Sequence, residues 1–328
     1  MILGLSALVF GTSALTPNDL MTTKAPVQVT RTKNSSFDVS AHIKAGLQER
    51  NRMSAAKPAN TPEILSEAFT NYKDLTVSAA LVSRALDPEN WVAQGAHFDP
   101  QFNNKLVQSV QEPFLQDHGI KEVISVGVSD FSGSDARRMQ NINATIAKFD
   151  GQIIKKGETF SFNDLLGSVS EEEGFTYARV LLNSANAWGL GGGVCQISTN
   201  VFRAALNAGL TIDQRRAHSV KFEKYEPAGL DATIYLGEID LQFTNNTPGD
   251  ILMKFAMRDE KMVTVFYGTK DTRQVSVAKT KHWEGYDGRE AAHWERKVQY
   301  AGHEEGKLFV SNYRPLVTED TEEVASTE

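Results

Sequence analysis

The side chain with the greatest chemical reactivity in this sequence is a single cysteine that follows a run of glycines. Cys195 is the one cysteine of the chain, and Gly191-Gly192-Gly193-Val194 comes directly before it. Three consecutive glycines let the backbone adopt conformations closed to other residues and approach a ligand closely. Apolar residues then recur at helical spacing, so we expect a helix that begins near Val194 and carries Cys195 in its first turn.

A cysteine in the first turn of a helix is well placed to act as a nucleophile. The unpaired N–H groups and the positive end of the helix dipole favour an anion there, which lowers the thiol pKa and populates the thiolate. Backbone N–H groups of this turn and of Gly192 and Gly193 could stabilise the oxyanion of a tetrahedral intermediate. The pattern therefore favours cysteine-dependent acyl transfer. The alternative is a buried structural cysteine, since free cysteines are often buried.

A cysteine nucleophile usually has a histidine within reach. Of the seven histidines, His218 is the best placed, because it follows the expected helix and a strand expected around residues 210–212. A helix followed by an antiparallel return can bring the chain back beside the start of the helix. Asp231 or Asp240, further along, could orient the imidazole, and spacing alone does not choose between them.

Other polar side chains are expected to line this site, bind substrate or hold the site in shape. They are Gln196, Ser198, Thr199, Ser161 and Asn163. The glycine run is not a phosphate loop, because the Gly-Lys-Ser/Thr ending is missing. A lone cysteine excludes a Cys-rich zinc site, and the histidines 282, 293 and 303 are too widely spaced for a local metal motif. We therefore expect neither a metal nor a cofactor.

The elements around this site are predicted from periodicity and from turn residues. Helices are expected from Ser134, as the N-cap, to residue 149, and from residue 194 to Gly209. Strands are expected at 123–128, 152–154, 159–162, 233–236, 239–243, 251–257 and 262–267. Helices before a run of antiparallel strands favour an α+β fold, with an antiparallel sheet and a few packed helices.

Composition limits the classes of protein that this chain could be. It has 328 residues, of which 41% are hydrophobic, so it can bury a sizeable core. Lys and Arg number 34 against 41 Asp and Glu, for a formal net charge of -7. Without a basic excess to neutralise phosphates, we expect no nucleic-acid partner.

Changes in composition along the chain predict six parts. Residues 1–15 are uncharged and mainly apolar, which is typical of a signal peptide, although a basic start is missing. We expect export to an extracytoplasmic location, with this segment as a membrane tether if it is retained; a buried helix or strand is the alternative. The other parts are a polar linker at 16–62, a small accessory segment at 63–119, the main domain at 121–268, a C-terminal extension at 269–317 and an acidic tail at 318–328.

Five blocks of the main domain resemble the VanW family in order and spacing. They are Gly157–Asn163, Gly191–Thr199, His218-Ser219, Gly229–Thr233 and Ile239–Asn246. The resemblance implies a bacterial protein of the cell envelope, in a family named after a component of vancomycin-resistance clusters. It also implies a cysteine L,D-transpeptidase that acts on peptidoglycan stem peptides, with Cys195 as nucleophile and His218 as base. The usual His-Gly-Cys motif of L,D-transpeptidases is absent, because here the cysteine precedes the histidine.

Two other functions remain open at this point. A non-catalytic module that binds the envelope or peptidoglycan, or acts as a scaffold in the response to glycopeptide antibiotics, would use the same fold with Cys195 merely packed. A cysteine amidase or peptidase would use the same pair and transfer the acyl group to water. An unreactive thiol would favour the first, and product analysis would separate hydrolase from transferase.

Overall fold

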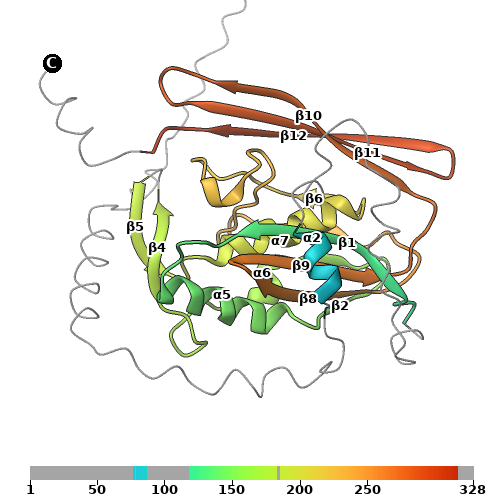
Figure 1. Ribbon diagram of the computed structural model, residues 1–328, viewed down its shortest axis with the longest axis horizontal. Coiled ribbons are helices and arrows are strands. Elements are labelled where there is room, and N and C mark those ends of the chain that lie inside the picture. The colour runs from blue at the N-terminus through green and yellow to red at the C-terminus, as the bar shows by residue number, and fades with distance from the viewer. Residues whose placement is uncertain (1–76, 78, 87–117, 183–184, 317–328) are drawn as a thin grey trace, which may run out of the picture. The chain divides into compact units, whose positions relative to one another are not determined.

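The computed structural model describes residues 77, 79–86, 118–182 and 185–316. All strands paired into sheets in these ranges are antiparallel, and helices pack against the sheets, which confirms the predicted α+β class (Figure 1). The apolar start, the polar linker, most of the accessory segment and the acidic tail lie outside the described residues.

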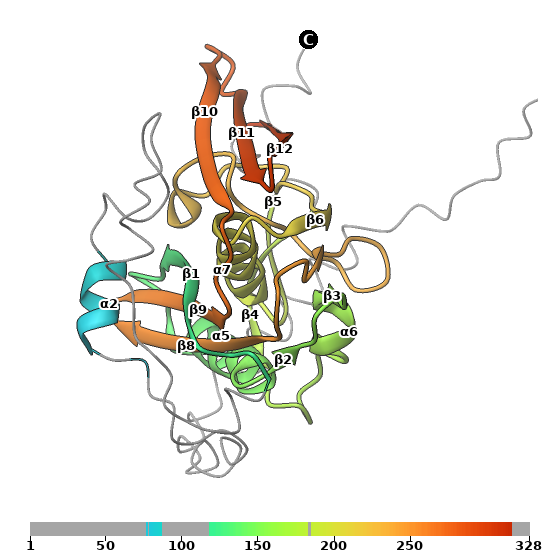
Figure 2. The same cartoon turned by 90° about the vertical axis from the view of Figure 1, so that its right-hand side faces the viewer.

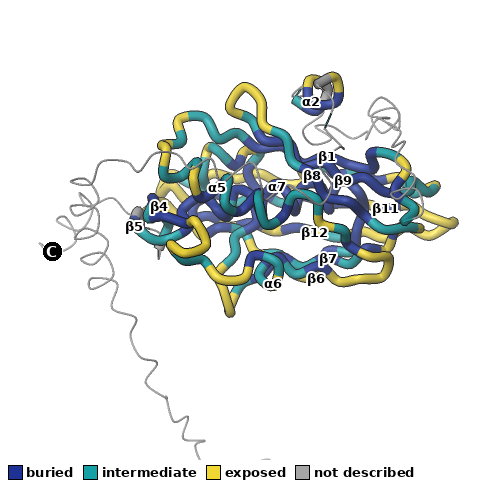
Figure 3. Tube along the Cα trace, turned by 90° about the horizontal axis from the view of Figure 1, so that it is seen from below, coloured by how far each residue is buried: buried dark blue, intermediate teal, exposed yellow. Residues whose placement is uncertain are grey.

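The main sheet has four strands in the order β1-β9-β8-β2. Their bounds are Glu122–Asp130 for β1, Lys261–Gly268 for β9, Ile251–Arg258 for β8 and Ile153–Ile154 for β2. A two-residue turn joins β8 to β9, with a positive φ at both Asp259 (51°) and Glu260 (58°), as the favoured hairpin turn requires. The bounds of β8 and β9 confirm the strands predicted at 251–257 and 262–267. Much of this sheet is buried (Figure 3).

Helices cover both faces of the main sheet (Figure 2). α7, Val194–Asn207, lies on one face with α5, Ala136–Phe149, and α2, Ala79–Ala85, lies on the other. Both long helices predicted from the sequence are therefore confirmed. The N-cap of α5 is Asp135 and not the predicted Ser134, because the Asp135 carboxylate accepts the N–H of Arg138 at 2.8 Å.

α7 approaches β1 very closely at Gly127. A Cβ at this position would lie 2.1 Å from the carbonyl oxygen of Asn200, so only glycine fits. Polar side chains of the helix bond to the sheet backbone: Asn200 Nδ2 donates to the Met262 carbonyl at 3.0 Å, and Asn207 Nδ2 to the Val126 carbonyl at 2.8 Å. These bonds set the position of α7 over the sheet, and so the position of its first turn.

Smaller elements flank the helices. β3 (Thr159–Ser161), β7 (Gln242–Thr244) and β6 (Thr211–Gln214) form a three-stranded sheet, and β4 (Tyr177–Leu182) pairs with β5 (Ala185–Leu190). The strand predicted at 159–162 ends one residue early, because Ser161 caps a short helix, α6 (Phe162–Leu166), by accepting the N–H of Asp164. The sequence analysis predicted neither α6 nor the β4–β5 hairpin.

The strands predicted at 233–236 and 239–243 are largely wrong. Only isolated bridges form there, between Arg216 and Thr233 and between Tyr235 and Ile239, and β7 begins at Gln242. The chain instead turns tightly around Gly237, whose φ is 80°. The N–H of Tyr235 donates to the Ile239 carbonyl at 2.8 Å, and the N–H of Ile239 donates back at 2.9 Å. This turn leaves Thr233 and Ile234 beside the start of α7.

The C-terminal extension forms a sheet that the sequence analysis did not predict. Its strands are β10 (Gln274–Glu284), β11 (Glu290–Tyr300) and β12 (His303–Tyr313). Apolar side chains of all three strands join the core that also contains α7. The ring of Phe309 on β12 meets that of Phe202 on α7 edge-on, with centroids 5.6 Å apart. The C-terminal extension therefore helps to hold α7 in place.

Candidate active site

Cys195 lies in the first turn of α7, where the chain leaves the glycine run. Gly193 precedes the helix with a φ of 117°, in the left-handed region that favours glycine. Every residue of α7 except Cys195 is buried, and Cys195 is partly exposed. Of this helix, only the residue that carries the thiol reaches the surface.

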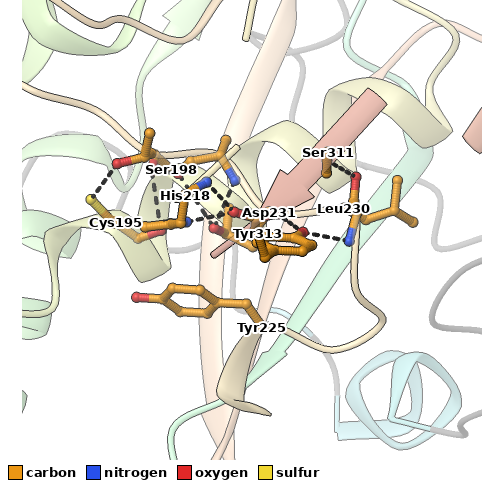
Figure 4. A network of polar contacts seen from close by, with 12 residues as sticks. Cys195, Ser198, His218, Tyr225, Leu230, Asp231, Ser311 and Tyr313 are labelled. Atoms are coloured by element: carbon orange, nitrogen blue, oxygen red, sulfur yellow. Dashed lines mark hydrogen bonds and ion pairs between the residues drawn. The ribbon is translucent and has the colours of Figure 1, made fainter. Parts of the chain in front are cut away.

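The loop after β6 returns the chain to the start of α7 and brings His218 to the thiol (Figure 4). His218 Nδ1 lies 2.5 Å from Asp231 Oδ2, and the backbone N–H of His218 donates to the same oxygen at 2.7 Å. A carboxylate only accepts hydrogen bonds, so Nδ1 carries a proton and Nε2 remains for the thiol. Of the two candidate carboxylates, Asp231 is the one that contacts the imidazole.

The thiol and the imidazole contact neighbours from two parts of the chain. Cys195 Sγ lies 3.8 Å from Thr233 Oγ1 and 3.8 Å from the carbonyl oxygen of Ile234. The imidazole of His218 packs against Phe222 and against Tyr225 at the end of the short helix η3 (Glu223–Tyr225), with ring centroids 5.5 and 5.0 Å apart. These aromatic residues were not predicted from the sequence, although their position a few residues after His218 was a usable signal.

The three polar groups shift one another's pKa. Burial raises the pKa of Cys195, but the hydrogen bond and the charge of His218, with the contacts to Ile234 and Thr233, together outweigh burial and hold this pKa below the ordinary value of a thiol. Burial lowers the pKa of His218, but its contacts with Asp231 and Cys195 raise it well above the ordinary value. Burial also raises the pKa of Asp231, and His218 and Arg215 together hold it well below the usual range. These directions favour a thiolate beside an imidazolium at neutral pH.

Asp231 has two further partners that the sequence analysis did not single out. Arg215 lies 3.3 Å from Asp231 Oδ1 and also donates through Nε to the Asp231 carbonyl at 2.7 Å. The hydroxyl of Tyr313 donates to Oδ1 at 2.6 Å. All three side chains are buried almost completely, so the carboxylate is desolvated and fully hydrogen-bonded.

Two backbone N–H groups at the start of α7 have no acceptor among the described residues of the protein. The N–H groups of Val194 and Gln196 close turns, donating to Gly191 and Gly193 carbonyls at 3.1 and 3.0 Å. Within the described ranges, those of Gly193 and Cys195 donate to no protein acceptor. They belong to the turn that carries the thiol and can donate to an anion.

Gly192, which was also predicted as a substrate or oxyanion contact, packs against the β4–β5 hairpin. A Cβ at Gly192 would lie 2.5 Å from the carbonyl oxygen of Arg179, and the Gly192 carbonyl accepts Asn141 Nδ2 at 2.9 Å. The structure therefore uses this glycine for a close approach of two backbones.

Gln196, Ser198 and Thr199 are fully buried and bond to the protein itself. Gln196 Nε2 donates to the Asp130 carbonyl on β1 at 2.7 Å. Ser198 Oγ donates to the Ala232 carbonyl at 2.6 Å, and Thr199 Oγ1 accepts the N–H of Ala232 at 3.1 Å. These side chains attach the start of α7 to β1 and to the segment that carries Asp231.

Ser161 and Asn163 bond to residues 239 and 240, which follow the segment that carries Asp231. Ser161 Oγ donates to Asp240 Oδ2 at 2.6 Å, and the N–H of Asn163 donates to Asp240 Oδ1 at 2.9 Å. Asn163 Nδ2 donates to the Ile239 carbonyl at 2.9 Å. Asp240 thus holds one end of the turn around Gly237. The other end of this turn places the Ile234 carbonyl beside the thiol.

A positive charge lies beside the first turn of α7. An Nη of Arg138 donates to Gln196 Oε1 at 2.9 Å and to the Tyr225 hydroxyl at 3.3 Å, while its Nε is buried without a partner. Arg138 forms no ion pair with a carboxylate in the part of the chain that the structure describes. Lys224 adds a second cation, whose pKa is lowered by burial and by the charge of Arg138.

Two further features of the described part of the chain concern metal-ligand groups and membrane-spanning helices. No group of three or more His, Cys, Asp or Glu side chains in it is arranged to hold a metal ion. No helix in it is long and apolar enough to span a membrane.

Comparison with known proteins finds similarity over the part of the chain that carries the site. The family described as VanW like protein matches residues 137–267. The chain contains a VanW-like domain. YoaR of Bacillus subtilis, an uncharacterised protein, is 32% identical over 142 residues, which are 43% of this chain and 46% of YoaR. The vancomycin B-type resistance protein VanW of Enterococcus faecalis is 34% identical over 135 residues, which are 40% of this chain and 49% of VanW.

The matches to both relatives cover somewhat less than half of their length. No solved structure matches the chain. Cys195, His218 and Asp231 all lie inside the VanW-like domain, whereas β1 and the whole β10–β12 sheet lie outside the matched residues. The chain is therefore related to a vancomycin resistance protein through the segment that carries the reactive side chains.

Proposed function

We propose that the VanW-like domain is an extracytoplasmic cysteine acyltransferase that acts on peptidoglycan stem peptides as an L,D-transpeptidase. One arrangement carries the proposal: the thiol of Cys195, a partly exposed residue at a helix start, interacts with His218, whose Nδ1 is held 2.5 Å from the buried Asp231. A nucleophile, a base and a carboxylate that orients the base are the groups that cysteine acyl transfer requires.

In the first half of the reaction, the Cys195 thiolate adds to the carbonyl carbon between the third stem residue and D-Ala. The N–H groups of Gly193 and Cys195 stabilise the oxyanion that forms. The C–N bond then breaks, and the imidazolium of His218 gives its proton to the leaving amine. D-Ala departs, and the stem remains on Cys195 as a thioester.

In the second half, the amine of another stem attacks the thioester carbonyl. Neutral His218 takes a proton from this amine, the C–S bond breaks, and Cys195 leaves as a thiolate beside the imidazolium. The product is an amide crosslink between two stems. Asp231 keeps Nδ1 protonated throughout, so Nε2 can give and take the proton.

Two observations support an anionic substrate of the cell envelope. One relative is named a vancomycin B-type resistance protein, and the resemblance to its family implies an envelope role. In addition, Arg138 and Lys224 place positive charge near the first turn of α7, although the chain as a whole has a formal net charge of -7. Stem peptides carry carboxylates, which a local cation attracts even on an acidic protein.

The decisive experiment is product analysis with purified disaccharide-tetrapeptide, using the Cys195→Ser variant as the matched control. We expect free D-Ala, crosslinked dimers and a covalent adduct on the wild-type protein, and none of these with Cys195→Ser. Mass spectrometry of products and of intact protein would measure all three.

The same experiment distinguishes the alternatives. Free D-Ala and tripeptide without dimers would contradict transpeptidation and indicate a hydrolase. Absence of product, together with a thiol that reacts only after unfolding, would favour a non-catalytic module that binds peptidoglycan.

A further inference from the structure

A residue outside the VanW-like domain contacts the carboxylate of the site. Tyr313 is the last residue of β12, beyond the matched segment 137–267, and is buried. Its hydroxyl donates to Asp231 Oδ1 at 2.6 Å and accepts the N–H of Gly229 at 2.7 Å (Figure 4). One hydroxyl thus joins the end of the C-terminal sheet to the segment that carries Gly229 and Asp231.

The C-terminal sheet holds this segment at several other points. Trp294 Nε1 on β11 donates to the Ala228 carbonyl at 2.8 Å, and Ser311 Oγ on β12 donates to the Gly229 carbonyl at 3.3 Å. The N–H of Arg314 donates to the carbonyl of Ser219, the residue after His218, at 2.7 Å. The chain on both sides of the His218–Asp231 contact is therefore attached to β11 and β12.

We propose that Tyr313 is a positioning residue of the Cys195 site, which makes the β10–β12 sheet part of the reactive centre. The two oxygens of Asp231 have different partners: Oδ2 receives both hydrogen bonds from His218, and Oδ1 is held by Tyr313 and Arg215. A carboxylate can rotate about its Cβ–Cγ bond. Fixing Oδ1 therefore fixes the direction in which Oδ2 faces the imidazole.

The chemistry of the phenol suits this role. Burial and the nearby Asp231 raise the pKa of Tyr313, so the hydroxyl stays protonated and donates to the carboxylate at all pH values of interest. A single phenol hydroxyl can donate once and also accept, which matches its two partners here. The inference rests on the proposed role of Cys195 as a nucleophile, and the thiol can be tested without a peptidoglycan substrate.

The test is a double-mutant cycle on thiol reactivity, with Tyr313→Phe, Asp231→Asn and both together. Alkylation of the folded protein by iodoacetamide is followed as a function of pH. We expect Tyr313→Phe to slow alkylation at neutral pH by about tenfold or less, and to raise the pH midpoint, because one charge-assisted hydrogen bond is lost. If Tyr313 acts through Asp231, Tyr313→Phe changes neither quantity in the Asp231→Asn background.

Two controls separate positioning from general stability. Tyr286→Phe alters an exposed tyrosine in the turn between β10 and β11 and should leave the profile unchanged. Ser311→Ala loosens the attachment of Gly229 without touching the carboxylate, so it should lower the melting temperature and leave the pH midpoint in place. Should Tyr313→Phe not fold, a fluorotyrosine at position 313 serves as second variant, and a midpoint equal to that of the unmodified protein would contradict the proposal.

The outcomes also distinguish this inference from the proposed function. An unchanged profile in His218→Ala would contradict the pairing of Cys195 with His218, on which the proposed function rests. A profile shifted by His218→Ala and Asp231→Asn but not by Tyr313→Phe would overturn only the role of Tyr313. Additive effects of Tyr313→Phe and Asp231→Asn would overturn it as well.

Discussion

His218 donates two hydrogen bonds to one oxygen of Asp231, through its backbone N–H at 2.7 Å and through Nδ1 at 2.5 Å. Because ring and backbone are held by the same atom, the imidazole cannot turn without losing a bond. The nitrogen that remains, Nε2, is the one available to Cys195. A carboxylate that fixes both the orientation and the proton of an imidazole is the feature that makes His218 suitable as a base.

The thiol of Cys195 should ionise at lower pH than a free thiol. We expect the midpoint of its alkylation profile to lie below about 8.5, the reference value, because His218, together with the contacts to Ile234 and Thr233, lowers the pKa more than burial raises it. His218→Ala should move the midpoint above the reference, since burial then dominates. The matched control is His303→Ala, an exposed histidine on β12, which should leave the profile unchanged. A midpoint that is the same in the wild-type protein and in His218→Ala would contradict the pairing.

The stability of the folded protein should depend on pH through Asp231. Its folded pKa lies well below the usual range, so its contribution is fully present above about pH 3.9, the unfolded value, and is lost as the pH falls through the folded value. Asp231→Asn should therefore cost about 3–5 kcal/mol at neutral pH, because it leaves buried partners unpaired. The cost should be smaller in strong acid. Urea unfolding of both proteins at neutral and acid pH measures this difference, and an equal cost at both would contradict it.

The pKa of His218 is raised, so its effect on stability has the opposite pH dependence. Its contribution is fully present below about pH 6.5, the unfolded value, and is lost as the pH rises through the raised folded value. The free energy lost in His218→Gln should therefore be greatest near pH 6 and decrease in alkaline solution. Urea unfolding across this range under reducing conditions tests the expectation, and a loss that grows with pH would reverse the assigned direction.

Gly229 and Gly237, on either side of Asp231 in the sequence, should differ in their tolerance of alanine. Both have a positive φ, 97° at Gly229 and 80° at Gly237, so each Gly→Ala change should cost about 1–2 kcal/mol of backbone strain. A Cβ at Gly229 would also lie 2.7 Å from the Trp294 ring, whereas nothing lies within 4 Å at Gly237. Gly229→Ala should therefore cost about 1–3 kcal/mol more and slow alkylation of Cys195. Thermal unfolding of the two variants measures the difference, and equal losses would show that the contact with Trp294 is not tight.

Arg138 should contribute to binding of an anionic donor. Arg138→Gln should raise KM for the stem peptide by about tenfold with kcat little changed, as expected when binding is equal in ground and transition states. Arg137→Gln is the matched control, because its guanidinium lies over the Trp188 ring, 5.5 Å from the centroid. The effect of Arg138→Gln should shrink at high salt, since screening weakens the attraction. Equal changes in the two variants would argue against a specific role for Arg138.

Local patterns were enough to predict the helix that carries Cys195. The periodicity of α7 and the glycine run before Cys195 involve residues close in sequence, and helix formation depends mainly on such neighbours. The same reasoning found α5, β8 and β9. It failed at 233–243, because the tight turn at Gly237 interrupts an alternating pattern that otherwise resembles a strand.

The choice between Asp231 and Asp240 required the tertiary structure. Both follow His218 at distances that an irregular segment can span, and only the positions of the attachments to α7 and α6 decide which one meets the imidazole. Likewise, no local pattern connects Tyr313 with Asp231, which is 82 residues earlier. The sequence by itself determined that Cys195 lies in the first turn of a helix, because helix formation and the glycine run depend on neighbouring residues. The tertiary structure decided which acid and which hydroxyl complete the site, because these contacts depend on how distant segments pack.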